Sequence, residues 1–200
     1  MAIATLAAAG KVCTGFSLPY VARYNYTGGA VSYTGGMKLA RGVDVLVEPE
    51  TSDANTFWAD NVQAETAGGQ LTGGTLTLTV DGLLKTAEAL ISGLPAAGDD
   101  GWTYYGDNQQ VPFIGVGFVA RFMSGGVTCY TPIVICKTMF NQVSTSAATE
   151  DQGEIEWQTQ ELSASILRSD DTNHNWKAVG NDYTTEAEAE AAIKTLFNIS

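Results

Sequence analysis

The pattern of apolar and polar residues changes its period within one stretch, residues 73–94, around which the predicted fold is organised. From 75 to 80, apolar residues alternate with threonines, which is typical of a strand with one buried face. After Asp81 the apolar positions follow helical spacing; they are Leu83, Leu84, Ala87, Leu90, Ile91 and Leu94. We expect Asp81 to cap this helix and Gly93 to end it in a left-handed conformation. Because so short a helix is marginal alone, its apolar stripe must lie on a sheet.

Further strands are predicted at 37–48, 57–66, 111–123, 127–140 and 154–167. In the first of them, valines at 43, 45 and 47 face one side, whereas Asp44, Leu46 and Glu48 face the other. Residues 41–80 should therefore hold three strands with one long hairpin. A second helix is predicted over 185–197, because Thr185 and Glu188 have the spacing of a capping box.

The first 36 residues show no sustained period. Alanine, glycine and threonine dominate, and YTGG occurs at 26–29 and again at 33–36, where the glycine pairs indicate turns. We expect an extended, irregular N-terminal arm over 1–36. Residues 37–200 should then form a single β domain that includes the C-terminal helix. The expected fold class is mainly β with two short α-helices (α+β).

The charge and the cysteines limit the functions that fit. The 200 residues carry a formal net charge of −12, the wrong sign for a protein that grips phosphates. The spacing of the three cysteines matches no disulfide framework, which indicates reduced thiols and assembly in a cytoplasm. No basic residue precedes the first apolar run, so we interpret the N-terminus as mature chain. No apolar run approaches the roughly 18 residues of a membrane span.

Candidate chemistry is sparse. His174 is the only histidine, and it lies in a polar run typical of a solvated loop. Asp171, Asn173, Asn175 and Asp182 have calcium-loop spacing, but Trp176 stands where a glycine is needed. Residues 115–120, GVGFVA, match a dinucleotide pattern but continue as strand, so Gly115 and Gly117 are better explained by close packing. We therefore expect no catalytic, cofactor-binding or metal-binding residues, and no enzyme activity.

Several segments together carry a family resemblance. They are Ala40–Glu50 followed by FWADN, the strand–helix unit at 73–94, VPFIGVGFVARFMSGG at 111–126, the strand ending in Lys137–Phe140, and the tail with Trp176 and the helix YTTEAEAEAAIKTLF at 183–197. In order and spacing the chain resembles the major tail tube proteins of long-tailed (siphovirus-type) bacteriophages. The match covers most of the chain as a whole-domain pattern, and it is weakest over the N-terminal 35 residues.

The resemblance implies a β-sandwich or barrel flanked by a helix. In the family, six copies form a ring, and rings stack into a hollow conduit for DNA ejection into the host cell. The implied partners are copies of the chain itself, the tape measure protein, and the tail terminator and tip proteins. DNA would pass without specific binding, because an acidic bore repels phosphate. The implied location is the virion tail, assembled in the bacterial host cytoplasm, with no membrane insertion and no cofactor.

Two sets of site residues follow from the resemblance. The candidate lumen-facing acids are Asp44, Glu48, Asp60, Glu65, Glu154 and Glu156. Candidate contacts between rings lie in the arm 1–35, the loop 48–57 and the loop 144–153. They are Tyr26, Tyr33, Glu50, Phe57 and Thr149.

Three alternatives remain open from the sequence. The chain fits equally the tube of a phage-derived bacteriocin or gene-transfer particle. A secreted β-sandwich module would use Trp102, Tyr104 and Tyr105 as a ligand platform. A hydrolase would use a close pair among the strand carboxylates.

Overall fold

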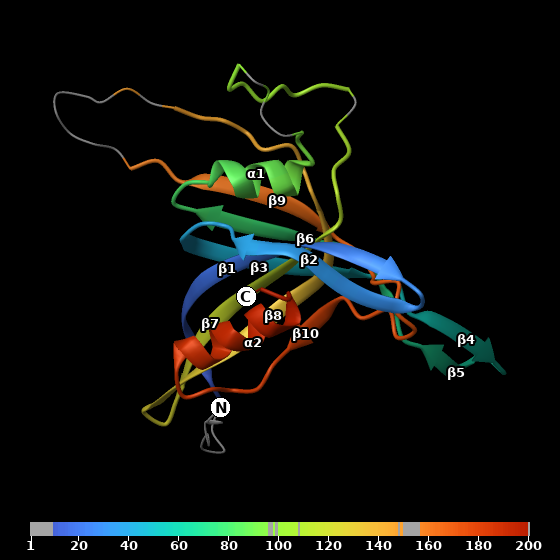
Figure 1. The fold of residues 1–200 in the computed structure, drawn as a ribbon. Helices are drawn as coiled ribbons and strands as arrows, with labels where there is room; N and C mark the ends of the chain where they lie inside the picture. The colour runs from blue at the N-terminus through green and yellow to red at the C-terminus, as the bar shows by residue number, and fades with distance from the viewer. Residues whose placement is uncertain are drawn as a thin grey trace.

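A computed structural model describes residues 10–95, 98, 100–107, 109–147, 149 and 157–199. The elements are β1 Val12–Thr27, β2 Ala30–Lys38, β3 Gly42–Thr51, β4 Asn55–Ala59, β5 Val62–Ala67, β6 Leu71–Val80, α1 Lys85–Ser92, β7 Ile114–Ser124, β8 Val127–Phe140, β9 Gln160–Ile166, β10 Lys177–Val179 and α2 Glu186–Leu196. The mainly β class with two short helices is therefore confirmed (Figure 1).

One antiparallel sheet organises the molecule. Its strands run in the order β2-β1-β7-β8-β9-β6-β3, and β10 pairs with β8. The sheet curls until the backbone of Gly42 in β3 lies against the Phe16 ring of β1. Yet no ladder joins β2 or β1 to β3 in the part of the chain that the structure describes. Of the β-sandwich or barrel that the resemblance implies, a closed barrel does not form in the described chain, because this path leaves β2 and β3 as open edges.

The strand–helix unit predicted at 73–94 forms largely as expected. Leu76, Leu78 and Val80 are fully buried in the main core, whereas the intervening threonines are only half-buried. The stripe of α1 packs into the same core through Ala87 and Ile91. These contacts confirm that the apolar stripe of α1 lies on the sheet.

The two ends of α1 differ in how well they were predicted. Gly93 ends the helix with a φ of 65°, as expected. The predicted Asp81 cap is wrong, because the helix begins after Leu84 and has no side-chain cap. The Asp81 carboxylate instead accepts hydrogen bonds from the backbone N and the Nε of Arg41, at the start of the neighbouring strand.

The expected irregular arm is wrong for residues 12–36, which form β1 and most of β2. Val21 and Ala22 of β1 are fully buried, in the two cores on opposite faces of the sheet. The first glycine pair makes the β1–β2 turn, with φ values of 62° and 84°. The second pair falls where the β1–β2 register shifts, so it forms a bulge within β2 instead of a turn.

The single strand predicted at 57–66 is also wrong, since these residues form most of the β4–β5 hairpin. Asp60 and Asn61 connect the strands, both with positive φ, as in the tight turns that suit a hairpin twist. Residues 42–80 consequently contain four strands.

The remaining strand predictions succeed to different degrees. The 127–140 strand is confirmed with its exact bounds as β8, and its hairpin partner β7 lies within one to three residues of the predicted range. β3 starts later than expected, at Gly42, and β9 is confined to Gln160–Ile166. Residues 154–156 of the predicted last strand lie outside the described part of the chain.

Helix α2 covers the opposite face of the sheet from the main core. Its predicted cap is confirmed, because Thr185 Oγ1 accepts from the Glu188 backbone N. Ile193 and Phe197 pack over β7, where a Cβ on Gly117 would lie 2.7 Å from Ile193 Cγ2. A Cβ on Gly115 would lie 2.4 Å from the Tyr33 ring. The interpretation of these two glycines as close-packing positions is confirmed.

Polar contacts also hold α2 to β1. Glu190 accepts a hydrogen bond from the Tyr20 hydroxyl at 2.5 Å. It also forms an ion pair with Lys194, whose Nζ lies 2.8 Å from the carboxylate. The Lys194 contact, followed by the Tyr20 hydrogen bond, lowers the pKa of Glu190 below its ordinary value of 4.5. A carboxyl group whose pKa is lower in the folded state stabilises the fold at pH values above its unfolded-state pKa. This stabilisation is lost as the pH falls through the folded-state pKa.

We expect the Glu190→Gln protein to lose less thermal stability than wild type as the pH is lowered. Thermal melts between about pH 5 and pH 2 should show a smaller fall in Tm for Glu190→Gln than for wild type, because the substitution removes one group whose protonation weakens the α2 contact. Glu65→Gln, on the exposed strand β5, is the matched control and should follow the wild-type curve. Parallel curves for Glu190→Gln and wild type would contradict this assignment.

Candidate functional site

The outer face of the β3–β6–β9 part of the sheet is polar except at Leu46. Residues directly opposite in antiparallel strands share a face. The register places Asp44 opposite Thr79, which in turn is opposite Glu161, and it places Glu48 opposite Thr75. We call this surface the acidic face; its residues are Asp44, Leu46, Glu48, Thr75, Thr77, Thr79, Glu161, Ser163 and Ser165. Leu46, which is 49% exposed and opposite Thr77, is the apolar member of this set.

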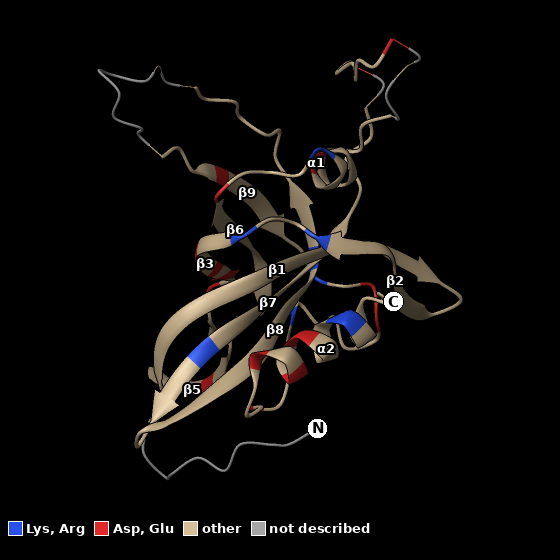
Figure 2. Cartoon of the chain, turned by 60° about the vertical axis from the view of Figure 1, so that its left-hand side comes forward, with Lys and Arg blue, Asp and Glu red and all other residues tan. Residues whose placement is uncertain are grey.

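The acidic face combines exposed carboxylates with short hydroxyl side chains. Asp44, Glu48 and Glu161 are exposed, and no lysine or arginine stands among the outward-facing residues that define the face. The nearby Arg41 is paired with Asp81. Figure 2 shows acidic segments, in red, on β3 and β9. The helices lie elsewhere, with α1 in the main core and α2 over β7 and β8. A surface of this kind repels phosphates and offers them no cationic partner.

The structure brings together only some of the predicted lumen acids. Asp44 and Glu48 lie on the acidic face, whereas Asp60 lies in the β4–β5 turn and Glu65 lies on β5 opposite Phe57. Glu154 and Glu156 lie outside the described residues. Sequence reasoning missed Glu161, and the signal that could have found it is the Thr-Leu alternation of β6, which marks the polar face that β9 continues. The role of all these acids stays a prediction.

The β4–β5 hairpin is a second unusual feature. Among the described residues it pairs with no strand of the main sheet, and it projects from the molecule (Figure 1). Phe57, Trp58 and Val62 are 63%, 61% and 61% exposed, and every residue of β5 is exposed. An isolated two-stranded hairpin is marginal in water, and clustered exposed aromatics indicate an interaction site. This hairpin is therefore a candidate interaction surface.

The predicted ring–ring contacts lie in different environments. Phe57 is on the hairpin, Glu50 and Thr149 are exposed, and Tyr26 is partly exposed near the end of β1. Tyr33 does not fit its prediction, because it is only 8% exposed. Its ring fills the space above Gly115 and its hydroxyl donates to the Cys136 carbonyl at 2.8 Å.

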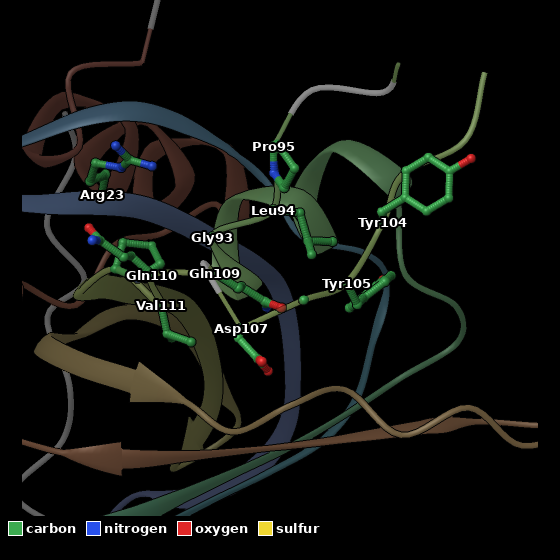
Figure 3. Close-up of a pocket in the computed structure, with 12 residues that line it drawn as sticks. Arg23, Gly93, Leu94, Pro95, Tyr104, Tyr105, Asp107, Gln109, Gln110 and Val111 are labelled. Carbon is green, nitrogen blue, oxygen red and sulfur yellow. The ribbon is translucent and has the colours of Figure 1, made fainter. Parts of the chain in front are cut away.

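A cavity of about 670 Å³ opens beside the C-terminal end of α1. Leu94, Pro95, Tyr104 and Tyr105 line it, together with Gln110 and Arg23 (Figure 3). We call it the α1 pocket. The Tyr105 hydroxyl donates to Glu88 at 2.5 Å, and this bond raises the pKa of Tyr105 to about 12. Of the three aromatics proposed as a ligand platform, Tyr104 and Tyr105 line this pocket, whereas Trp102 lines a smaller neighbouring one.

Residues with potential for catalysis or metal binding are engaged in loop contacts. His174 is exposed, with Nδ1 3.0 Å from the Ser169 carbonyl oxygen. The Asp171 carboxylate accepts hydrogen bonds from the backbone N and the side-chain amide of Asn175. Among the described residues, no group of three histidine, cysteine or acidic side chains is arranged to hold a metal ion.

Comparison of the sequence with protein-family models and with curated proteins finds no match. In the described part of the chain, no helix has both the length and the apolar character needed to cross a bilayer.

Proposed function

We propose that the protein is the structural subunit of a phage tail tube, stacking as hexameric rings into a hollow conduit for DNA ejection. The acidic face carries this proposal. It is a broad sheet surface with exposed carboxylates, with no cation among its residues and with no helix over it. A wall past which DNA slides needs these properties, since each cation would retain phosphates. In this proposal the role is structural and not catalytic.

The open sheet supports the ring. In the part of the chain that the structure describes, β2 and β3 are unpaired edges at the two ends of the strand order. Exposed edges invite pairing with another chain, and a head-to-tail contact between different edges closes into a ring when the rotation permits. A tail-tube-type sandwich, completed by neighbouring copies, is the fold that we propose for the assembly.

The projecting hairpin supports stacking. Phe57 and Trp58 are adjacent residues of β4, so their rings lie on opposite faces of the ribbon and neither face is buried in the subunit. Contacts with the next ring would bury both. The proposed partners are therefore copies of the chain, with the tape measure protein and the tail terminator and tip proteins at the tube's interior and ends. The proposed location is the virion tail, after assembly in the host cytoplasm.

Two further functions stay candidates. The same geometry suits the tube of a phage-derived bacteriocin or gene-transfer particle. The α1 pocket favours a secreted ligand-binding module, because its volume falls within the usual range of small-molecule sites. Such a module would remain a monomer and bind its ligand saturably.

Reversing the charge of the acidic face tests the proposed bore. Assembled particles of Asp44→Lys/Glu48→Lys/Glu161→Lys should retain double-stranded DNA at about 50 mM salt and lose it steeply as salt rises, because new cations release counterions from the phosphates. Wild-type particles should retain none. The neutral variant Asp44→Asn/Glu48→Gln/Glu161→Gln separates loss of repulsion from gain of attraction, and it should bind far less than the lysine variant. DNA retention by the lysine variant no greater than that of wild type would contradict a bore lined by this face.

A further inference from the structure

The segment 167–176, between β9 and β10, leaves the sheet and rejoins it at one point. The Leu167 backbone N donates to the Lys137 carbonyl oxygen at 2.9 Å. The Cys136 backbone N donates to the Trp176 carbonyl oxygen at 2.8 Å. Both ends of the segment are thus bonded to adjacent residues of β8. A surface loop of this length whose ends lie close together is an Ω-loop, a type that is often functional, and we call this segment the Ω-loop.

The Ω-loop is held together by its own contacts. The Asp171 carboxylate accepts hydrogen bonds from the backbone N and the side-chain amide of Asn175, at 3.0 Å and 2.8 Å. The Ser169 backbone N donates to the Asn175 carbonyl oxygen at 3.3 Å. Because these bonds lie within the loop, they shape it without fixing it to the sheet.

Asp170 fixes the middle of the Ω-loop to the sheet. Its carboxylate oxygen Oδ2 lies 2.7 Å from Lys137 Nζ on β8. The same oxygen accepts a hydrogen bond from the Tyr24 hydroxyl of β1 at 3.0 Å, and the Asp170 backbone N donates to that hydroxyl oxygen at 2.9 Å. One residue of the loop therefore contacts two strands.

The two partners of this ion pair differ in their exposure to solvent. The Lys137 side chain is 10% exposed, whereas that of Asp170 is 43% exposed. Lys137 Nζ also lies 4.4 Å from the centre of the Phe113 ring and 5.1 Å from that of the Tyr24 ring. A buried charge that loses its partner is strongly destabilising, whereas a half-exposed charge remains solvated by water. Without the carboxylate, the Lys137 ammonium would regain solvation when the loop opens.

We propose that the Ω-loop opens as one unit while the rest of the domain stays folded, and that the Asp170–Lys137 ion pair is the latch that keeps it closed. In the open state, Lys137 and the Tyr24 hydroxyl face solvent. Segments that open locally in this way are the ones that proteins use for binding and regulation. The latch is independent of the proposed tube function.

Hydrogen exchange followed by mass spectrometry, at concentrations too low for assembly, tests the latch. In the Asp170→Asn protein, amides of the Ω-loop should exchange about tenfold faster than in wild type, or more, because the unpaired Lys137 favours the open state. Amides of β6 and α1 should keep their wild-type rates. Asp53→Asn, which neutralises an exposed acid elsewhere, is the matched control and should leave exchange in the Ω-loop unchanged.

A second variant tests the role of the buried cation. Lys137→Met replaces the ammonium by an apolar group of similar length and leaves only a half-exposed carboxylate, so exchange in the Ω-loop should rise less than about threefold. Adding Lys137→Met to Asp170→Asn should bring the exchange rate down to this lower level. The latch is refuted if Asp170→Asn leaves the Ω-loop unchanged, if it accelerates β6 and α1 equally, or if Lys137→Met has as large an effect.

Discussion

Replacing Gly117 by valine is expected to lower the free energy of unfolding by about 3 kcal/mol, the largest stability effect that we predict. Even a Cβ at this position would lie 2.7 Å from Ile193 Cγ2 and 3.0 Å from Phe197 Cε2. Both side chains are almost fully buried, so they cannot move aside without displacing α2. Valine adds two more methyl groups to this conflict.

Thermal unfolding followed by circular dichroism would measure the effect at concentrations too low for assembly, since association raises apparent stability. For a chain of this size, the loss corresponds to a Tm shift of roughly 10 °C. Gly82→Val is the matched control, because no atom lies within 4 Å of a Cβ built there. If the Gly117→Val protein has the same Tm as wild type, α2 does not pack closely on β7.

Removing the aromatic rings of the hairpin is expected to weaken assembly strongly without unfolding the subunit. Phe57→Ser/Trp58→Ser deletes two large exposed rings from β4, a strand that makes no ladder with the main sheet. Since aromatic anchors carry most of the energy of an interface, the concentration of half-assembly should rise at least about 100-fold. Because both side chains are exposed, subunit stability should change by no more than about 0.5 kcal/mol.

Sedimentation velocity over a concentration series separates these two effects, with Trp102→Ser as a control of equal chemistry elsewhere on the surface. Normal assembly of the double variant would exclude the hairpin as a contact. Unfolding of the double variant would instead show that the rings stabilise the subunit itself.

Elements in which apolar residues recur at a regular spacing were predictable from the sequence. In β6 and α1 the change from a two-residue to a helical period marks both elements, because each buries one face only. The start of β8 follows from the glycine turn at 125–126 before it, and α2 follows from its capping box. In each case the determining interactions are local.

The missed elements depend on contacts between distant residues. The alternation of β1 is obscured because both of its faces are buried, one in each core. The β4–β5 hairpin is exposed on both faces, so no apolar side marks its strands, and its Asp60–Asn61 turn is hidden within FWADN. Tyr33 sits between turn-like glycines yet is buried, because Gly115 on a distant strand leaves room for its ring.

The candidate site was predictable only in part for the same reason. Asp44 and Glu48 are marked by their own strand, but Glu161 joins them only through the register of β9 on β6. The α1 pocket likewise needs Arg23 of β1 to meet the segment after α1. Pairings of this kind are fixed by the fold as a whole.

Negative-stain electron microscopy of the purified protein at high concentration tests the central claim most directly. We expect rings of six subunits with an open centre, stacking into tubes of constant width. Isolated monomers at every concentration, or solid particles with no axial channel, would contradict the account.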